Sequence, residues 1–155
     1  MDLKNSLYAQ KALMLSNKGY NCAQSVLLAF TDLADIDRIT AGKISSSFGG
    51  GLGMGDVCGV ASAMAMVLGL LYGINIPENI EEKQAHYDRV KGLILKFKEK
   101  VGSHICSELL GIDGKCLFIP SEESEPLWNG RPCKFLIAYG AYLLEEYIKE
   151  NPIFS

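Results

Sequence analysis

The stretch that decides the fold of this chain is Val57-Cys58-Gly59-Val60-Ala61-Ser62-Ala63-Met64-Ala65-Met66-Val67-Leu68-Gly69-Leu70-Leu71-Tyr72-Gly73-Ile74. No charged residue occurs from position 57 to position 77. A stretch of this length and polarity could span a membrane or form the central helix of a soluble bundle. The nearest basic residues, Lys43 and Lys83, are too distant to anchor the ends of a membrane-spanning helix. We therefore predict no membrane span and a central helix that other helices surround.

The segments on both sides of this stretch have the apolar periodicity of amphipathic helices. Ile80, Tyr87 and Ile94, for example, recur at intervals of seven residues. No segment alternates between polar and apolar residues as a half-buried strand does. The pattern predicts helices over residues 2–17, 22–34, 37–46, 78–101, 104–110 and from Pro132 to about 150. The fold class that follows is all-α: one domain over residues 1–155, with about six helices around the central apolar helix.

Composition excludes several classes of protein. The chain has 155 residues, 48% of them hydrophobic, and a formal net charge of −3, so it has no basic field that would bind nucleic acid or an anionic membrane. Residues 1–4 lack the basic and apolar regions of a signal peptide, and we expect a cytoplasmic protein without structural disulfides. An exposed part of the central helix would favour a homodimer.

Four of the five cysteines share a local setting at the start of a predicted helix. Cys22 follows Asn21, a good N-cap, while Cys58 opens the apolar helix, Cys106 follows Ser103, and Cys133 follows Pro132. Helix N-termini stabilise a thiolate over a thiol. The plainer interpretation, a small buried hydrophobe, fits Cys116 in its loop. For the other four we predict convergence at one site that uses deprotonated sulfur.

Cys58 is expected to be the most thiolate-like of the five. It starts the longest apolar helix, and its glycine neighbours leave room around the sulfur. Burial and the nearby charge of Asp56 would act against this, although capping of the helix is the more natural role for Asp56.

A glycine-rich segment precedes the apolar helix. Five of the sixteen glycines fall between positions 49 and 55, namely Gly49, Gly50, Gly51, Gly53 and Gly55. This density indicates backbone that adopts positive φ or approaches another group closely. The segment matches no nucleotide-binding fingerprint, since it has no Gly-Lys-Ser/Thr ending and follows a helix. We predict a tightly folded loop beside Cys58 whose glycines contact whatever the cysteines bind.

The cysteine spacings exclude sites built from local ligand pairs. There is no C-x-x-C, which argues against a thioredoxin-like dithiol, a zinc finger or a ferredoxin-type cluster. His86 and His104 are poorer candidates, because an isolated histidine at such positions is more often a polar surface residue.

The order of motifs resembles the C_GCAxxG_C_C family of small prokaryotic redox-active proteins. The resemblance rests on Gly19-Tyr20-Asn21-Cys22, the glycine segment, Cys58-Gly59-Val60-Ala61-Ser62-Ala63, Cys106-Ser107-Glu108-Leu109-Leu110-Gly111 and Cys133. It covers almost the whole chain and makes Cys22, Cys58, Cys106 and Cys133 the family's four cysteines. Val60 and Ala63 depart from the alanine and glycine of its C-G-A-x-x-G element. The chain is also similar to the cysteine-bearing part of split-Soret cytochromes, although it has no C-x-x-C-H haem attachment site.

Two functions follow from these residues and from the resemblance. The first is a thiol-dependent oxidoreductase in which Cys22, Cys58, Cys106 and Cys133 are catalytic and react with a redox partner protein or a small oxidant or reductant. The second is an electron-transfer or metal-binding module in which the same four cysteines ligate an iron–sulfur cluster or zinc.

Overall fold

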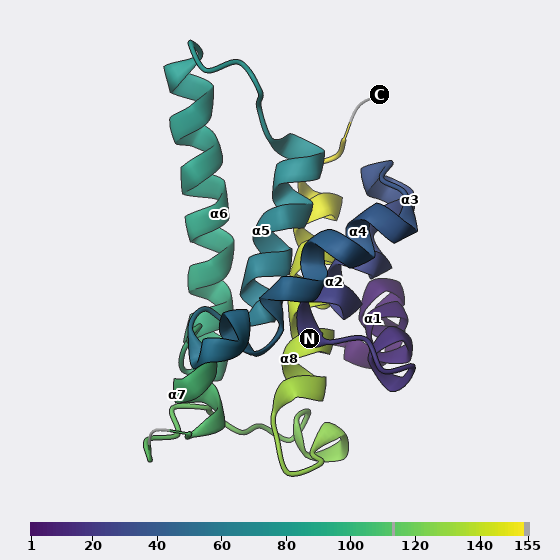
Figure 1. The fold of residues 1–155 in the computed structure, drawn as a ribbon, viewed down its shortest axis with the longest axis vertical. Coiled ribbons are helices and arrows are strands. Elements are labelled where there is room, and N and C mark those ends of the chain that lie inside the picture. Colours follow the sequence, from purple (N-terminus) through teal and green to yellow (C-terminus); the bar gives the residue numbers. More distant parts are fainter. Residues whose placement is uncertain (113, 154–155) are drawn as a thin grey trace.

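The chain folds into a bundle of helices in this computed structural model, which describes residues 1–112 and 114–153 (Figure 1). These residues form eight α-helices: α1 Leu7–Asn17, α2 Cys22–Ala29, α3 Thr31–Ala34, α4 Arg38–Ser45, α5 Gly59–Tyr72, α6 Ile80–Val101, α7 Cys106–Leu110 and α8 Cys133–Glu150. Short turns of other helix types cover Leu3–Asn5 (η1), Ser46–Phe48 (η2), Gly51–Gly55 (η3) and Glu125–Leu127 (η4). The predicted all-α class is confirmed, and no named strand occurs among the described residues.

Two of the predicted helices, residues 2–17 and 22–34, are each divided in two. In each, one residue with non-helical backbone geometry interrupts the helix. Ser6 separates η1 from α1, because its side chain caps α1 by accepting the N–H of Ala9 at 3.1 Å. The hydroxyl of Ser6 also donates to the buried carboxylate of Glu145 on α8. Phe30 separates α2 from α3 with φ of −110°, and its ring is fully buried against Tyr8.

The apolar helix α5 packs against α2, α6 and α8. Its first half is buried, including Val60, Met64 and Val67, and α8 comes close because Gly140 has no side chain where Val60 and Met64 lie. Its last turn extends beyond this cover, so that Leu70 is 43% exposed. In the part of the chain that the structure describes, no helix has the length and apolar character needed to cross a bilayer.

The long helix α6 runs beside α5 and rises beyond it, and residues 73–79 connect the two at that end (Figure 1). Only Leu93, Phe97 and Val101 of α6 are fully covered, all in its second half. The first half therefore projects from the bundle.

Candidate functional site

The predicted helix-start positions of the cysteines are confirmed for three of the four. Cys22, Cys106 and Cys133 are the first residues of α2, α7 and α8, while Cys58 is the N-cap residue of α5, one position earlier. No disulfide links them, and the described structure has all five cysteines as free thiols.

Asn21 fixes the start of α2 and thus the position of Cys22. Its side-chain oxygen accepts the N–H of Gln24 at 2.9 Å, and the Gln24 side chain accepts the N–H of Asn21 at 3.1 Å, which completes a capping box. The side-chain amide of Asn21 also donates to the carbonyl oxygen of Ser46 at 3.0 Å. The cap of α2 therefore holds the entry to the glycine segment as well.

All four of these cysteines line one cavity of about 260 Å³, which we call the cysteine cavity. The remaining walls come from the end of α1, the glycine segment, the start of α5, α7 and the start of α8. The lining residues are Ser16, Tyr20, Asn21, Cys22, Gly50, Cys58, Gly59, Val60, Cys106, Leu109, Leu110, Arg131, Cys133, Leu136 and Ile137. Four thiols from distant parts of the sequence thus share one mostly apolar space.

A single antiparallel β-bridge between Val57 and Ile105 joins two of the cysteine segments. The N–H of Cys58 donates to the carbonyl oxygen of His104, and the N–H of Cys106 donates to that of Asp56, both at 2.7 Å. Because side chains alternate along extended backbone, Cys58 and Cys106 project from the same face of this bridge. The bridge thereby aligns two thiols that lie 48 positions apart in sequence. It also uses the backbone of Asp56, whose side chain does not cap α5 as predicted.

The glycine segment folds as a left-handed turn. Gly50, Gly51, Leu52 and Gly53 have φ between 61° and 69°, and the N–H of Asp56 closes the turn on the carbonyl oxygen of Gly51 at 3.0 Å. Glycine reaches this region without steric cost, which explains the density of glycines. Of the five glycines predicted to contact a ligand, Gly50 alone lines the cysteine cavity.

Burial governs the acidity of the cavity thiols. The pKa of Cys58 is raised far above its ordinary value, first by desolvation and then by Cys22, and the N–H groups of Val60 and Ala61 only partly offset this. The expectation that Cys58 is the most thiolate-like cysteine is therefore wrong, because its side chain is only 4% exposed. Desolvation also raises the pKa of Cys106 and of Cys133.

Like Cys106, Cys22 interacts electrostatically with each of the other three cavity thiols. It contributes to the raised pKa of Cys58, Cys106 and Cys133, so its sulfur lies within electrostatic reach of each of them. The charge of Arg131 acts in the opposite direction and lowers the pKa of Cys106 and Cys133. The sequence patterns did not single out Arg131, since an isolated arginine in a turn carries no motif.

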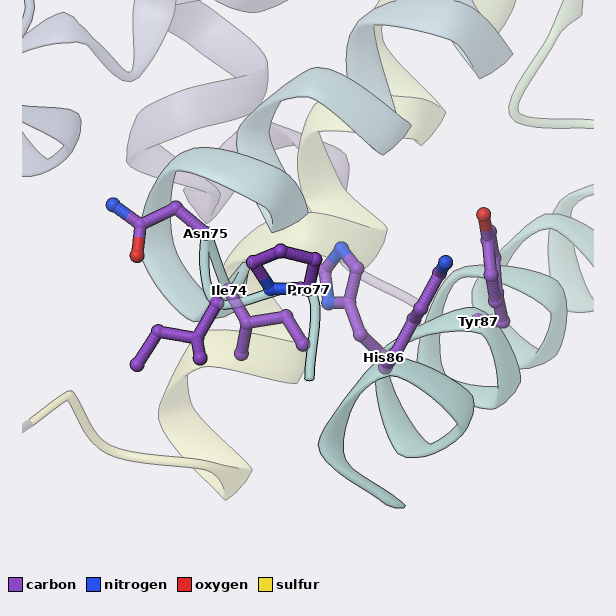
Figure 2. Close-up of a pocket in the computed structure, with 7 residues that line it drawn as sticks. Ile74, Asn75, Pro77, His86 and Tyr87 are labelled. Atoms are coloured by element: carbon purple, nitrogen blue, oxygen red, sulfur yellow. The ribbon is translucent and has the colours of Figure 1, made fainter. Parts of the chain in front are cut away.

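Other residues considered from the sequence lie outside this cavity. Cys116 is exposed, and its thiol donates to the carbonyl oxygen of Leu109 at 3.4 Å. His104 contributes its backbone carbonyl to the β-bridge but not its ring to the cavity wall. His86 lines a separate, larger cavity of about 410 Å³ between the α5–α6 connection and the first turns of α6. There its ring lies beside Pro77, with Tyr87 standing apart (Figure 2).

Thiolates are the ligands that iron–sulfur clusters and zinc prefer, so the donor chemistry of the cavity suits either. Within residues 1–112 and 114–153, however, no group of three or more His, Cys, Asp or Glu side chains is arranged to hold a metal ion. The side chains as positioned therefore do not fit a metal centre.

Comparison with known proteins supports the resemblance seen in the sequence. A family described as "Putative redox-active protein (C_GCAxxG_C_C)" matches residues 20–147, most of the chain. No curated protein and no solved structure matches this chain. The matched region contains all four cavity cysteines and the glycine turn. The chain belongs to the C_GCAxxG_C_C family of redox-active proteins.

Proposed function

We propose that the four cavity cysteines form a thiol–disulfide redox site in which Cys22 is the attacking thiol. The observation that supports this most directly is that thiols from four separate segments line one cavity of about 260 Å³. Cys22 is less deeply buried than Cys58 and Cys106, and the capping box at Asn21 fixes its position at the start of α2. It also lines the same cavity as the three candidate resolving thiols.

The reaction we propose transfers two electrons to a disulfide substrate. The Cys22 thiolate attacks one sulfur of that disulfide, so that a mixed disulfide forms and one substrate thiolate leaves. A second cavity cysteine then loses its proton and attacks the sulfur of Cys22, which expels the second substrate thiolate. Two protein thiols become one disulfide, and the substrate disulfide becomes two thiols.

Equilibration of the reduced protein in buffers of defined dithiol–disulfide ratio tests this proposal. Trapping with an alkylating reagent and peptide mass spectrometry should reveal one two-electron couple whose disulfide contains Cys22. Cys22→Ser should abolish it, whereas Cys116→Ser, which alters an exposed thiol outside the cavity, should leave its midpoint unchanged. A protein that forms no disulfide among the cavity cysteines, or pairs them indiscriminately with Cys116, would overturn the proposal.

A metal or iron–sulfur centre on Cys22, Cys58, Cys106 and Cys133 is the second candidate. It is favoured by one observation, that four thiols line the cavity where a dithiol reaction needs two. The same side chains are not arranged around a common ion, which is why we rank it second. Anaerobic purification with metal analysis and a visible spectrum separates the two functions, and stoichiometric iron or zinc would overturn the first.

A further inference from the structure

We propose that Arg131 makes the cysteine cavity selective for small disulfides that carry a carboxylate group. This inference rests on the proposed thiol–disulfide function and names the class of substrate. It follows from the charge that Arg131 brings to the cavity, from the absence of a counterion among the described residues, and from the size and polarity of the space.

Among the residues that the structure describes, Arg131 is the one charged side chain that lines the cysteine cavity. Its other described lining residues are the four cysteines, two glycines, the polar side chains of Ser16, Tyr20 and Asn21, and five apolar side chains. Since no carboxylate of residues 1–112 and 114–153 lines this space, a guanidinium at its wall sets the sign of the potential that an entering molecule meets.

The guanidinium of Arg131 has no partner within the described residues. The two ion pairs found there are Lys11–Asp32 and Lys149–Glu146, and the neighbouring Lys134 binds the side chains of Ser16 and Asn17. The pKa shifts of Cys106 and Cys133 have Arg131 and other cysteines as their charged causes, with no carboxylate among them. Arg131 is exposed, so its donors face solvent and are open to a ligand, and a carboxylate is the group that this planar fork binds best.

The dimensions of the cavity limit the ligand to a small molecule. Pockets that hold drug-sized ligands run from about 300 to 1,000 Å³, and this one is about 260 Å³. Leu109, Leu110, Leu136 and Ile137 give it walls that suit a short hydrocarbon chain. A short aliphatic disulfide with a terminal carboxylate matches both features.

With such a substrate, Arg131 binds the carboxylate while a cavity thiolate attacks the disulfide. The substrate S–S bond breaks, a protein–substrate disulfide forms, and one mercapto-acid leaves and takes a proton from water. A second cavity thiol displaces the other, so that one protein disulfide and two mercapto-acids result. Arg131 takes part by holding the substrate and carries no electrons.

The test compares three disulfides of similar length and different charge: 3,3′-dithiodipropionate, hydroxyethyl disulfide and cystamine. The rate of oxidation of the reduced protein is measured for each, and the ratio of variant to wild-type rate cancels their intrinsic reactivities. Arg131→Glu should lower the rate with the anionic disulfide about tenfold or more and raise that with cystamine. Arg131→Lys should retain part of the preference for the anionic disulfide. This result would show that a variant with a cation at this position folds and reacts.

Arg38→Glu is the matched control, because it makes the same change in net charge at an exposed residue on α4 outside the cavity. It should change all three rates by one common small factor. If Arg131→Glu does the same, the inference is wrong while the redox proposal stands.

A second readout separates failure of the inference from failure of the redox proposal. Adipate, a dicarboxylate without sulfur, should slow alkylation of Cys22 in the wild type but not in Arg131→Glu. Protection by adipate without disulfide exchange would support the carboxylate site and overturn the redox proposal, and no protection in the wild type would overturn the carboxylate site.

Discussion

A Cβ atom on Gly59 would lie 2.5 Å from the sulfur of Cys22 and 2.8 Å from the carbonyl oxygen of Phe48. No carbon atom fits at such distances, so the sulfur of Cys22 rests against the bare backbone of the first turn of α5. The φ of Gly59 is not positive, and its helical conformation would suit any residue. Contact with Cys22 and Phe48, rather than backbone conformation, therefore requires glycine here.

Gly59→Ala should displace the sulfur of Cys22 or lift α5 away from α2. We expect a loss of about 1–3 kcal/mol in the free energy of unfolding, as for other overpacked cores, together with slower oxidation of Cys22. Urea denaturation and mass spectrometry measure the two effects. Gly69→Ala is the control in the same helix, because its Cβ would meet nothing within 4 Å, and it should stabilise by about 0.5–1 kcal/mol. A stable Gly59→Ala with normal Cys22 chemistry would contradict the close contact.

Asn21→Ala should lower stability and also change the reactivity of Cys22. The capping bonds and the bond to Ser46 are lost together, at a cost of about 1–2 kcal/mol for the cap. Asn79→Ala provides the comparison, since Asn79 caps α6 by accepting the N–H of Glu82 at 3.1 Å and lies outside the cavity lining. Both variants should unfold at lower urea concentration, but only Asn21→Ala should alter the rate at which Cys22 is alkylated. Equal alkylation rates in the two would show that the cap does not position the thiol.

The helices could be predicted from the sequence because local signals fix them. Apolar periodicity and the Asn21 cap predict helices whose bounds agree with those of the structure to within a few residues. The interruptions at Ser6 and Phe30 could not be predicted, since they depend on Glu145 of α8 and on the burial of an aromatic ring. Tertiary contacts override propensity at both positions.

The candidate site was predictable in position but not in electrostatics. A shared helix-start setting picks out Cys22, Cys58, Cys106 and Cys133, and these are the thiols that line the cavity. The acidity of Cys58 depends on how much water reaches it, which only the packed structure fixes. The Val57–Ile105 bridge and the place of Arg131 likewise arise from pairing between distant segments.

Leu52→Asn should stabilise the protein. Leu52 has φ of +61° inside the glycine turn, and its side chain is half exposed, so that little packing offsets the steric cost of the left-handed conformation. Asparagine tolerates this region, and we expect a gain of about 0.5–1 kcal/mol in urea denaturation. Met54→Asn changes a more exposed residue of the same turn whose φ is not positive, and it should bring no gain. Equal effects of the two substitutions would argue against strain at Leu52.

Cys116 should react with iodoacetamide before Cys58 in the native, reduced protein. Cys116 is exposed, whereas Cys58 is only 4% exposed and burial raises its pKa, so Cys58 is both shielded from the reagent and held in the unreactive thiol form. A difference of about tenfold or more at pH 8 is expected by peptide mass spectrometry. Labelling in denaturing urea should remove this difference in rate between Cys116 and Cys58. Faster native labelling of Cys58 would mean that the cavity opens to solvent far more than the structure indicates.

Stability should fall as pH rises above 9, and Cys58 should account for a measurable part of the fall. The ordinary pKa of the thiol is 9.0, and burial raises the pKa of Cys58 well above that in the folded state. Above pH 9 the unfolded chain releases a proton that the native protein keeps, so deprotonation favours unfolding; the stabilising contribution is complete below pH 9 and is lost above it. From pH 8 to pH 10 this amounts to about 1.4 kcal/mol for Cys58 alone. Burial also raises the pKa of Tyr139 to about 12 and raises that of Cys106 and of Cys133, all of which adds to the decline. Substitution of Cys58 alone isolates its own contribution. Urea denaturation under reducing conditions should therefore give Cys58→Ala a shallower decline than the wild type, although Cys58→Ala starts from lower stability. Cys116→Ala, at an exposed position, should keep the wild-type slope. If Cys58→Ala and the wild type decline in parallel, Cys58 does not stay protonated in the native cavity.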